Sequence, residues 1–310
     1  MKKKSFVLFL LILVGLFIVD RVVFTVLHGV EKNVFTGQSV GKANQFNKAK
    51  DSVDLLVMGS SRAARHVDPS VFPMPGFNMG MDGTHLGYAT ALMSTLERKH
   101  QLILVHVDHH EVYDVDYDGE DMLALMNETL DSKKMQQFIK QYFPEEILLS
   151  EISRCYVYNG KVLGMVKNYM SGRKNFKLSN GYSPLVPTAE QKQTFQKILD
   201  KYGLYQEIEI SESVPVNANF ESYVDFAMEV ANRNDSKLVF FTSPSLNKVD
   251  GKVKQRTADF FAAKNVKYMD DLDFFKDFDI DYWKDRSHMS KIGAEIYSEK
   301  LRENLIKLVR

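Results

Sequence analysis

The sequence has one cysteine, one tryptophan and no excess of either charge. With Cys155 alone, neither an intramolecular disulfide nor a cysteine-rich metal site can form. Forty Lys and Arg balance forty Asp and Glu, so the chain lacks the basic excess typical of nucleic-acid binding. The residues around Cys155 show no partner motif for a nucleophilic thiol, and we expect this cysteine to be a small packed side chain.

The one long apolar stretch stands at the N-terminus. It follows lysines 2–4, covers residues 6–19, is interrupted by Asp20 and Arg21, and continues over 22–27. The first part alone fits the core of a cleaved signal peptide. The whole stretch is long enough to span a bilayer and no small-x-small cleavage site follows it, which favours an uncleaved signal anchor. Lysines before such a segment stay in the cytoplasm, so residues 1–27 predict a single-pass membrane protein with an extracytoplasmic domain, periplasmic or at the cell surface.

The rest of the chain divides at residue 51. Residues 28–50 are polar with little periodicity and predict a linker. Over 51–310, short apolar runs alternate with segments of helical spacing, which predicts an α/β fold of three α/β/α layers around a parallel, flavodoxin-like five-stranded sheet. The expected strands are 52–58, 76–80, 101–107, 236–243 and 265–270. Sites in such folds lie at the C-terminal ends of the strands.

Residues 112–219 interrupt this alternation. They contain helical pieces, such as 188–203, and a turn-rich patch at 178–187. We expect a helical insertion in the α/β domain, lying over the site or beside it. Nothing in the sequence indicates an oligomeric state.

Two serines follow the first expected strand. On this stretch alone Ser60 or Ser61 predicts a helix N-cap, because a serine oxygen accepts a free backbone N–H. Near the other end of the chain, Asp285 and His288 form an Asp-x-x-His pattern before the last expected helix. A carboxylate in that position can orient an imidazole whose other nitrogen takes a proton from a serine hydroxyl. Ser, Asp, His is a known chain order for such a triad.

A third block follows the second expected strand. Asn78, Gly80 and Gly83 stand in "NMGMDGT". Glycine lets a backbone N–H approach a substrate oxygen closely, so this block can supply an oxyanion donor. A strand-to-helix turn that needs positive φ would select the same glycines, and both explanations can hold together.

In this order the three blocks resemble those of the SGNH (GDSL-like) hydrolase superfamily. The stretch "GSS" is similar to the Gly-Asp-Ser block with Ser60 in place of Asp, which implies Ser61 as the nucleophile. The second block resembles Asn-x-Gly-x-x-Gly-x-Thr and implies the N–H of Gly83 as an oxyanion donor, with Asn78 beside it. Asp285 and His288 match the last block. The resemblance covers about residues 51–112 and 236–310.

The Gly-Ser-Ser form with an N-terminal anchor looks most like membrane-tethered bacterial cell-envelope members. These include proteins related to D-alanine transfer onto teichoic acids and to O-acetylation of surface polysaccharides. The resemblance implies a serine esterase or O-acyltransferase that acts on acyl esters of an envelope glycan or polymer and needs no cofactor. The acyl group and the acceptor stay open. The alternative is a catalytically impaired relative that binds envelope glycan or a membrane partner.

One block departs from the family. After the third strand the family has Gly-x-Asn-Asp, whose Asn side chain is a further oxyanion donor; this chain has "VHVDHHEVYD". His109 or His110 falls near the Asn position, and an imidazole N–H can donate there. Loss of one such donor costs about 2.7–4 kcal/mol of transition-state stabilisation. This departure motivates the alternative of a catalytically impaired protein.

The same stretch is rich in metal-ligating residue types. If the strand persists, alternation points His106, Asp108 and His110 to one face, and His109 and Glu111 to the other. The spacing matches no zinc signature such as His-Glu-x-x-His, so a polar strand end lining the cleft is the favoured interpretation, with no metal.

Two further features have competing explanations. Asp114, Asp116 and Asp118 imitate a calcium loop, but Leu125 stands where the bidentate Glu is required, which favours an acidic turn that caps a helix over 120–131. Arg62 adjoins Ser61 and either binds an anionic group of the substrate or pairs with nearby carboxylates.

Overall fold

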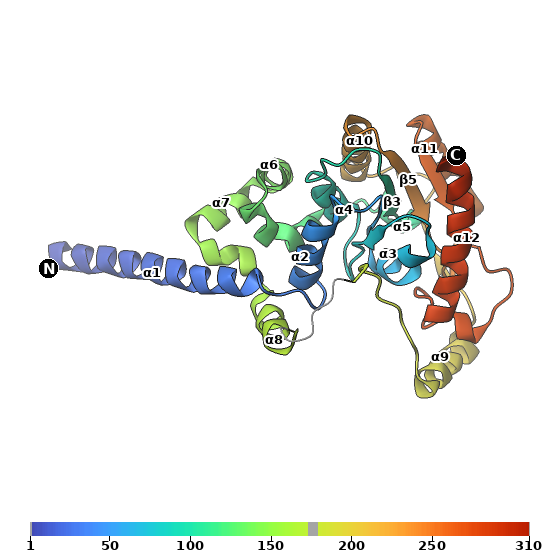
Figure 1. Cartoon of the computed structure of the whole chain (residues 1–310), viewed down its shortest axis with the longest axis horizontal. Helices are drawn as coiled ribbons and strands as arrows, with labels where there is room; N and C mark the ends of the chain where they lie inside the picture. The colour runs from blue at the N-terminus through green and yellow to red at the C-terminus, as the bar shows by residue number, and fades with distance from the viewer. Residues whose placement is uncertain (1, 173–178, 310) are drawn as a thin grey trace. The chain divides into compact units, whose positions relative to one another are not determined.

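The computed structural model describes residues 2–172 and 179–309 (Figure 1). Its contacts divide the chain into two compact units. The helical unit comprises Met1–Gln45 and Leu123–Leu178, and the sheet unit comprises Phe46–Met122 and Ser179–Arg310. The residues expected to form one insertion, 112–219, are therefore shared between the two units.

The sheet unit is built on a parallel sheet of five strands in the order β2-β1-β3-β5-β7. The strands are β1 (Leu55–Met58), β2 (Gly76–Asn78), β3 (Leu102–His106), β5 (Lys237–Thr242) and β7 (Lys267–Asp270). Each lies inside an expected range, so the predicted α/β class and five-stranded parallel sheet are confirmed. Chain order reverses between β1 and β3, the place where open parallel sheets form a crevice at their C-terminal edge.

The two central strands β1 and β3 are buried at every position. Strands shielded on both sides read as continuous apolar runs without alternation, which is why "LLVM" and "LILV" predict strands that a period-two rule would miss. In register, Val57 of β1 pairs with Asn78 of β2 and with Leu104 of β3. The C-terminal ends of these strands therefore lie together at one edge.

Helices connect and cover these strands. Helix α3 packs against α12, α4 against α10, α10 against β5, and α11 against β7. The helices of the sheet unit are α3 (Ser61–His66), α4 (Leu86–Met93), α5 (His109–Tyr113), α9 (Ala189–Tyr202), α10 (Ala218–Arg233), α11 (Gly251–Ala263) and α12 (Lys291–Val309). A second, two-stranded parallel sheet pairs β4 (Gln206–Ile208) with β6 (Asn247–Val249). Short 3-10 helices span Pro69–Val71 and Ile280–Tyr282.

The helical unit contains α1 (Lys2–Glu31), α6 (Lys133–Tyr142), α7 (Pro144–Ile152) and α8 (Val162–Gly172), with a 3-10 segment at Arg154–Tyr158. The 3-10 helix Glu120–Leu130 begins in the sheet unit and ends in the helical unit. Among the described helices, α1 is the one long and apolar enough to cross a membrane. It continues beyond the apolar stretch, and α2 (Val40–Ala49) follows it, so residues 28–50 are more helical than their polar composition predicts. The reason is tertiary: Asn44 donates to the carbonyls of Glu31 and Val34, which fixes α2 against the end of α1.

Candidate active site

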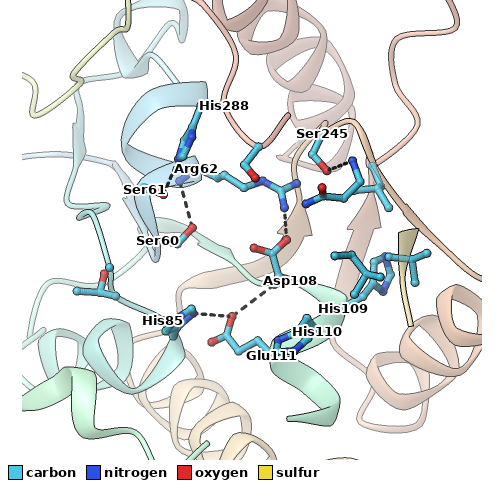
Figure 2. A pocket seen from close by; sticks show the side chains of 17 residues that line it. Ser60, Ser61, Arg62, His85, Asp108, His109, His110, Glu111, Ser245 and His288 are labelled. Carbon is cyan, nitrogen blue, oxygen red and sulfur yellow. Dashed lines mark hydrogen bonds and ion pairs between the residues drawn. The ribbon is translucent and has the colours of Figure 1, made fainter. Parts of the chain in front are cut away.

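The turn after β1 separates the two serines by role. Gly59 has φ of +117°, and a Cβ there would lie 2.8 Å from the carbonyl oxygen of His106, so a glycine is required. Ser60 is the N-cap of α3, and its Oγ accepts the N–H of Arg62 at 3.1 Å. Ser61 begins the helix, and its side chain points away from the capping bond toward His288 (Figure 2). Ser60 is therefore the structural serine of the pair.

Ser61, His288 and Asp285 form a hydrogen-bonded chain. Ser61 Oγ lies 2.9 Å from His288 Nε2. His288 Nδ1 lies 3.0 Å from Asp285 Oδ1 and 3.2 Å from Oδ2. With Nδ1–H donating to the carboxylate, Nε2 is free to accept the serine proton, the arrangement in which histidine acts as general base.

Backbone hydrogen bonds fix the carboxylate of Asp285 in the position from which it orients His288. Its Oδ1 accepts the backbone N–H groups of Ser287 and His288, each at 2.9 Å. Burial raises the pKa of Asp285, but the hydrogen bond and charge of His288 and the two N–H groups lower it, and the net pKa lies below the ordinary value. The carboxylate therefore stays ionised and fixes the orientation of the imidazole.

A second, buried histidine supports the triad. His66 Nε2 accepts the N–H of Met289 at 3.0 Å, and its Nδ1 lies 2.8 Å from Ser243 Oγ. Burial, with smaller contributions from Arg62 and His288, holds the pKa of His66 well below 6.5, so the ring is neutral. A neutral ring can accept from Met289 and donate to Ser243 at once. His66 thereby ties the loop that carries His288 to the helix that carries Ser61.

Gly83 lies with Ser61 and His288 in the wall of a cavity at this edge of the sheet. Its φ is +74°, and a Cβ would meet nothing within 4 Å. Within the described residues its N–H has no hydrogen-bond acceptor. Ser61, as the first residue of α3, has no helical acceptor for its own N–H. Within the described residues, the N–H groups of Ser61 and Gly83, which both line this cavity, thus have no acceptor.

Asn78 differs from its expected place beside the substrate. It is fully buried and is not among the residues that line the cavity. Its Nδ2 donates to the carbonyls of Ala63 at 2.8 Å and Val67 at 2.7 Å, and its Oδ1 accepts the N–H of Gly80. The amide therefore joins α3 to the end of β2 and has no donor left for substrate.

A cavity of about 280 Å³ opens at this edge of the sheet (Figure 2). Ser61 and His288 lie in its wall with Gly83. On another side the wall is formed by Ile208, Asn247 and Val249 of the β4–β6 pair. Local patterns do not reveal this part of the wall, because β4 and β6 are short and come from distant parts of the chain.

No protein-family model and no curated protein matches this chain.

The segment after β3 does not continue as a strand. The strand ends at His106, and α5 begins at His109 with Asp108 as its N-cap, so the strand does not persist and the alternation that depended on it does not apply. His106 is buried against Ser60 Oγ at 3.0 Å. His109 is buried between Thr257 Oγ1 at 3.0 Å and Asp270 Oδ2 at 3.1 Å. Of the three, only His110 is exposed, and it lines the cavity as the remaining candidate to replace the family's Asn.

Arg62 pairs with a carboxylate. Its guanidinium is buried and donates to the carboxylate of Asp108 and to the carbonyl of Ser243, while Nε lies 3.2 Å from Ser243 Oγ. The sequence left two roles open for Arg62, binding an anionic group of the substrate and pairing with a carboxylate. The structure contains the ion pair with Asp108. Arg62 thereby links the ends of β1, β3 and β5, and it lines the cavity together with Asp108.

His85 and Glu111 form a pair that sequence reasoning missed. Both line the cavity, with His85 Nδ1 3.7 Å from Glu111 Oε2 (Figure 2). The neighbouring Glu111 carboxylate raises the pKa of His85 to about 9; burial opposes this, and the charges of Asp121 and Asp108 add to it. His85 is therefore a cationic N–H donor two residues after Gly83. The sequence signal that could have identified His85 is its position directly after the "NMGMDGT" block.

Two stretches contain residue types that can bind ions, the one after β3 and the aspartates at 114–118. Within the described residues, no group of three or more His, Cys, Asp or Glu side chains is placed to hold a metal ion. Asp114 Oδ1 accepts the N–H of Asp116, and Asp118 Oδ1 accepts that of Glu120 at the start of the 3-10 helix. The aspartates thus shape and cap an acidic turn.

Cys155 is half-buried in the helical unit, where its thiol donates to the carbonyl of Asp20 at 3.2 Å. Burial, followed by the bond to Asp20, raises the pKa of Cys155. A thiol with a raised pKa carries little thiolate, so this cysteine lacks the character of a nucleophile.

Proposed function

We propose that this chain is a membrane-anchored, extracytoplasmic serine esterase or O-acyltransferase of the SGNH type. Its substrates are acyl esters of a cell-envelope glycan or polymer. The observation that carries the proposal is the Ser61–His288–Asp285 hydrogen-bond chain in the wall of a cavity that also holds the free N–H of Gly83.

In the first half-reaction His288 Nε2 takes the proton of Ser61 while Oγ attacks the ester carbonyl carbon. The oxyanion of the tetrahedral intermediate accepts hydrogen bonds from the N–H groups of Ser61 and Gly83. Asp285 stabilises the imidazolium that forms. His288 then gives its proton to the leaving alkoxide, the carbon–oxygen bond of the ester breaks, and an acyl group remains on Ser61.

In the second half-reaction a hydroxyl compound attacks the acyl-serine. His288 removes its proton as the oxygen bonds to the acyl carbon, and returns that proton to Ser61 Oγ as the bond between the acyl carbon and Oγ breaks. Water gives hydrolysis, and a sugar hydroxyl gives transfer. The β4–β6 pair, which forms one wall of the cavity through Ile208, Asn247 and Val249, is positioned to select the acceptor.

The SGNH assignment has two supports. The nucleophile, glycine and Asp-x-x-His blocks occur in the family's order. The strand order β2-β1-β3-β5-β7 is that of a doubly wound sheet, and a three-layer α/β/α arrangement of the sheet unit belongs to the same proposal. In this site Arg62–Asp108 occupies the place after β3, and His85 or His110 supplies the donor that the family takes from Asn.

The membrane location is supported by α1, whose apolar side chains from Phe6 to Val19 are largely exposed. The lysines before it favour a cytoplasmic N-terminus. This places the remainder of the chain outside the cytoplasmic membrane, where envelope polymers are found.

A second function is favoured by the altered block after β3. If neither His85 nor His110 replaces the missing donor, the chain is a catalytically impaired SGNH-fold protein that binds envelope glycan or a membrane partner. The two functions differ in turnover, because the binder retains the cavity without the reaction.

The test is hydrolysis of acetyl and alanyl esters by the full-length protein in detergent. We expect turnover that falls at least about 10³-fold in Ser61→Ala. Ser70→Ala is the matched control, since Ser70 is an exposed serine outside the cavity. Equal turnover by Ser61→Ala and wild type would overturn the proposal, and absence of turnover on every ester would favour the binder.

A further inference from the structure

Two helices of the helical unit expose apolar side chains on their outward faces. On α7, Leu148 is 55% and Ile152 65% exposed, while Ile147 is buried. On α8, Leu163 is 87% and Met170 80% exposed. Positions 148 and 152, and positions 163 and 170, recur at helical spacing, so each helix presents an apolar stripe to the outside. Such a surface indicates an interaction site.

Helix α6 of the same unit buries its apolar residues and exposes its polar ones. Its buried residues are Met135, Phe138 and Ile139. Its exposed positions are Lys133, Lys134, Gln137, Lys140 and Gln141. A helix that faces water carries its polar residues outward, as α6 does. Within the helical unit, α6 therefore lacks the exposed large apolar side chains that α7 and α8 carry.

The stripes adjoin the apolar surface of α1. Asp20 accepts the Oγ of Ser153 at 2.6 Å and the N–H of Arg154 at 2.9 Å, directly after α7 ends. Arg21 donates to the carbonyl of Ile152 at 3.5 Å. Helix α1 also contacts α8, and Figure 1 draws α7 and α8 beside its C-terminal half. The first charged residues after the apolar stretch thus lie at the level of the stripes.

The two charged residues at this level, Asp20 and Arg21, form an ion pair with each other. Arg21 also lies over the ring of Phe17 at 4.3 Å. Beyond them α1 still exposes Val22 at 59% and Val26 at 62%. Apolar surface therefore continues from α1 past its charged pair and onto the neighbouring helices.

We propose that the outward faces of α7 and α8 lie in the interfacial layer of the bilayer that α1 crosses. This inference rests on the membrane anchoring in the proposed function. A phospholipid surface is the occupant that fits, because it covers α1 and its neighbours as one continuous apolar region. Lys167, exposed on α8, can extend its ammonium to the headgroups while its stem lies along the apolar stripe.

The test measures lipid contact in the full-length chain in nanodiscs of phosphatidylcholine and phosphatidylglycerol. Nitroxide labels are placed singly at Leu163→Cys and Met170→Cys in a Cys155→Ser background. Gln137→Cys on α6 is the matched control, and Leu11→Cys reports whether α1 spans. Collision rates with oxygen, which partitions into lipid, are compared with those of a water-soluble nickel chelate.

We expect labels at 163 and 170 to favour oxygen over the nickel chelate several-fold, as at 11, and the label at 137 to show the reverse. Labels at 163 and 170 that behave like 137 overturn the inference. So do labels that neither reagent reaches, since this means that protein covers the face. A lipid-facing label at 11 with aqueous labels at 163 and 170 rejects this inference alone, whereas an aqueous label at 11 rejects the anchoring as well. Ester turnover tests the chemistry separately.

The wild-type chain provides a second measurement that needs no substitution. A photoactivated carbene carried by a lipid is used to label the nanodisc, and labelled peptides are mapped by mass spectrometry. Labels in α7 and α8 with none in α6 support the inference. Labels confined to α1 contradict it.

Discussion

Ser61 Oγ lies 2.9 Å from His288 Nε2, although 227 positions separate the two residues in the chain. Each residue stands close to an element of the sheet unit that positions it. Ser61 begins α3 directly after β1, and His288 stands just before α12, which packs against α3. The buried ring of His66 on α3 accepts the N–H of Met289. This hydrogen bond therefore holds the helix that carries Ser61 to the loop that carries His288.

Asp285→Asn tests the orientation of His288. An asparagine Oδ1 can still accept the N–H groups of Ser287 and His288, so the loop should keep its shape. The amide cannot stabilise the imidazolium, and we expect kcat to fall by about 10³- to 10⁴-fold. Steady-state kinetics with Asp273→Asn as an exposed control measures this. A kcat within tenfold of wild type would remove Asp285 from the mechanism.

Gly83→Ala tests the backbone donor. Gly83 and Gly160 have φ of +74° and +71°, and a Cβ at either would meet nothing within 4 Å. Both substitutions should therefore cost about 1–2 kcal/mol of stability through the left-handed backbone conformation. Only Gly83→Ala should also lower kcat, because the N–H shifts from the oxyanion. Equal kcat in the two variants would contradict the role of Gly83.

The stability of the chain should depend on His106 in mild acid. Burial lowers the pKa of His106 from 6.5 to about 3. Between these values the unfolded chain binds a proton that the folded chain does not, so the free energy of unfolding falls as pH falls. From pH 7 to 5 the loss from this residue is about 2 kcal/mol.

His106→Asn removes this proton uptake and can keep a hydrogen bond to Ser60 Oγ. Urea unfolding at pH 7 and pH 5 should show a shallower pH dependence than wild type. His100→Asn, at an exposed histidine, is the matched control for loss of an imidazole. An unchanged slope in His106→Asn would show that His106 is not neutral in the fold.

His85 should titrate well above other histidines. Its pKa is raised to about 9, first by the neighbouring Glu111 carboxylate. The stabilisation from this pair is present below pH 6.5 and is lost as pH rises through 9. Nuclear magnetic resonance of the His85 ring should show this high midpoint, and Glu111→Gln should lower it. A midpoint at or below 6.5 in wild type would mean that the cavity holds no cation at His85.

The sequence predicted the features that depend on neighbouring residues. The buried strands appear as apolar runs, and the turn after β1 appears as Gly59 followed by a capping serine. Ser61, His288 and Asp285 could be named because each stands beside an element boundary that local patterns reveal.

What the sequence did not reveal depends on distant partners. The β4–β6 pair joins 206–208 to 247–249, and neither segment has an apolar run of its own. His66 is identified only by Met289 and Ser243, which are far away in the chain. The helix start after β3 had a local signal in Asp108 and Glu111, whose spacing is that of a capping box, and Glu111 Oε2 does accept the Asp108 N–H at 3.4 Å.

The most direct test of the account is covalent labelling of the full-length protein with a fluorophosphonate. The account predicts one adduct, located on Ser61 by peptide mass spectrometry, absent in Ser61→Ala and strongly reduced in His288→Ala. Ser70→Ala should label like wild type. An adduct on another residue, or equal labelling of Ser61→Ala and wild type, would contradict the assignment of Ser61 as the nucleophile.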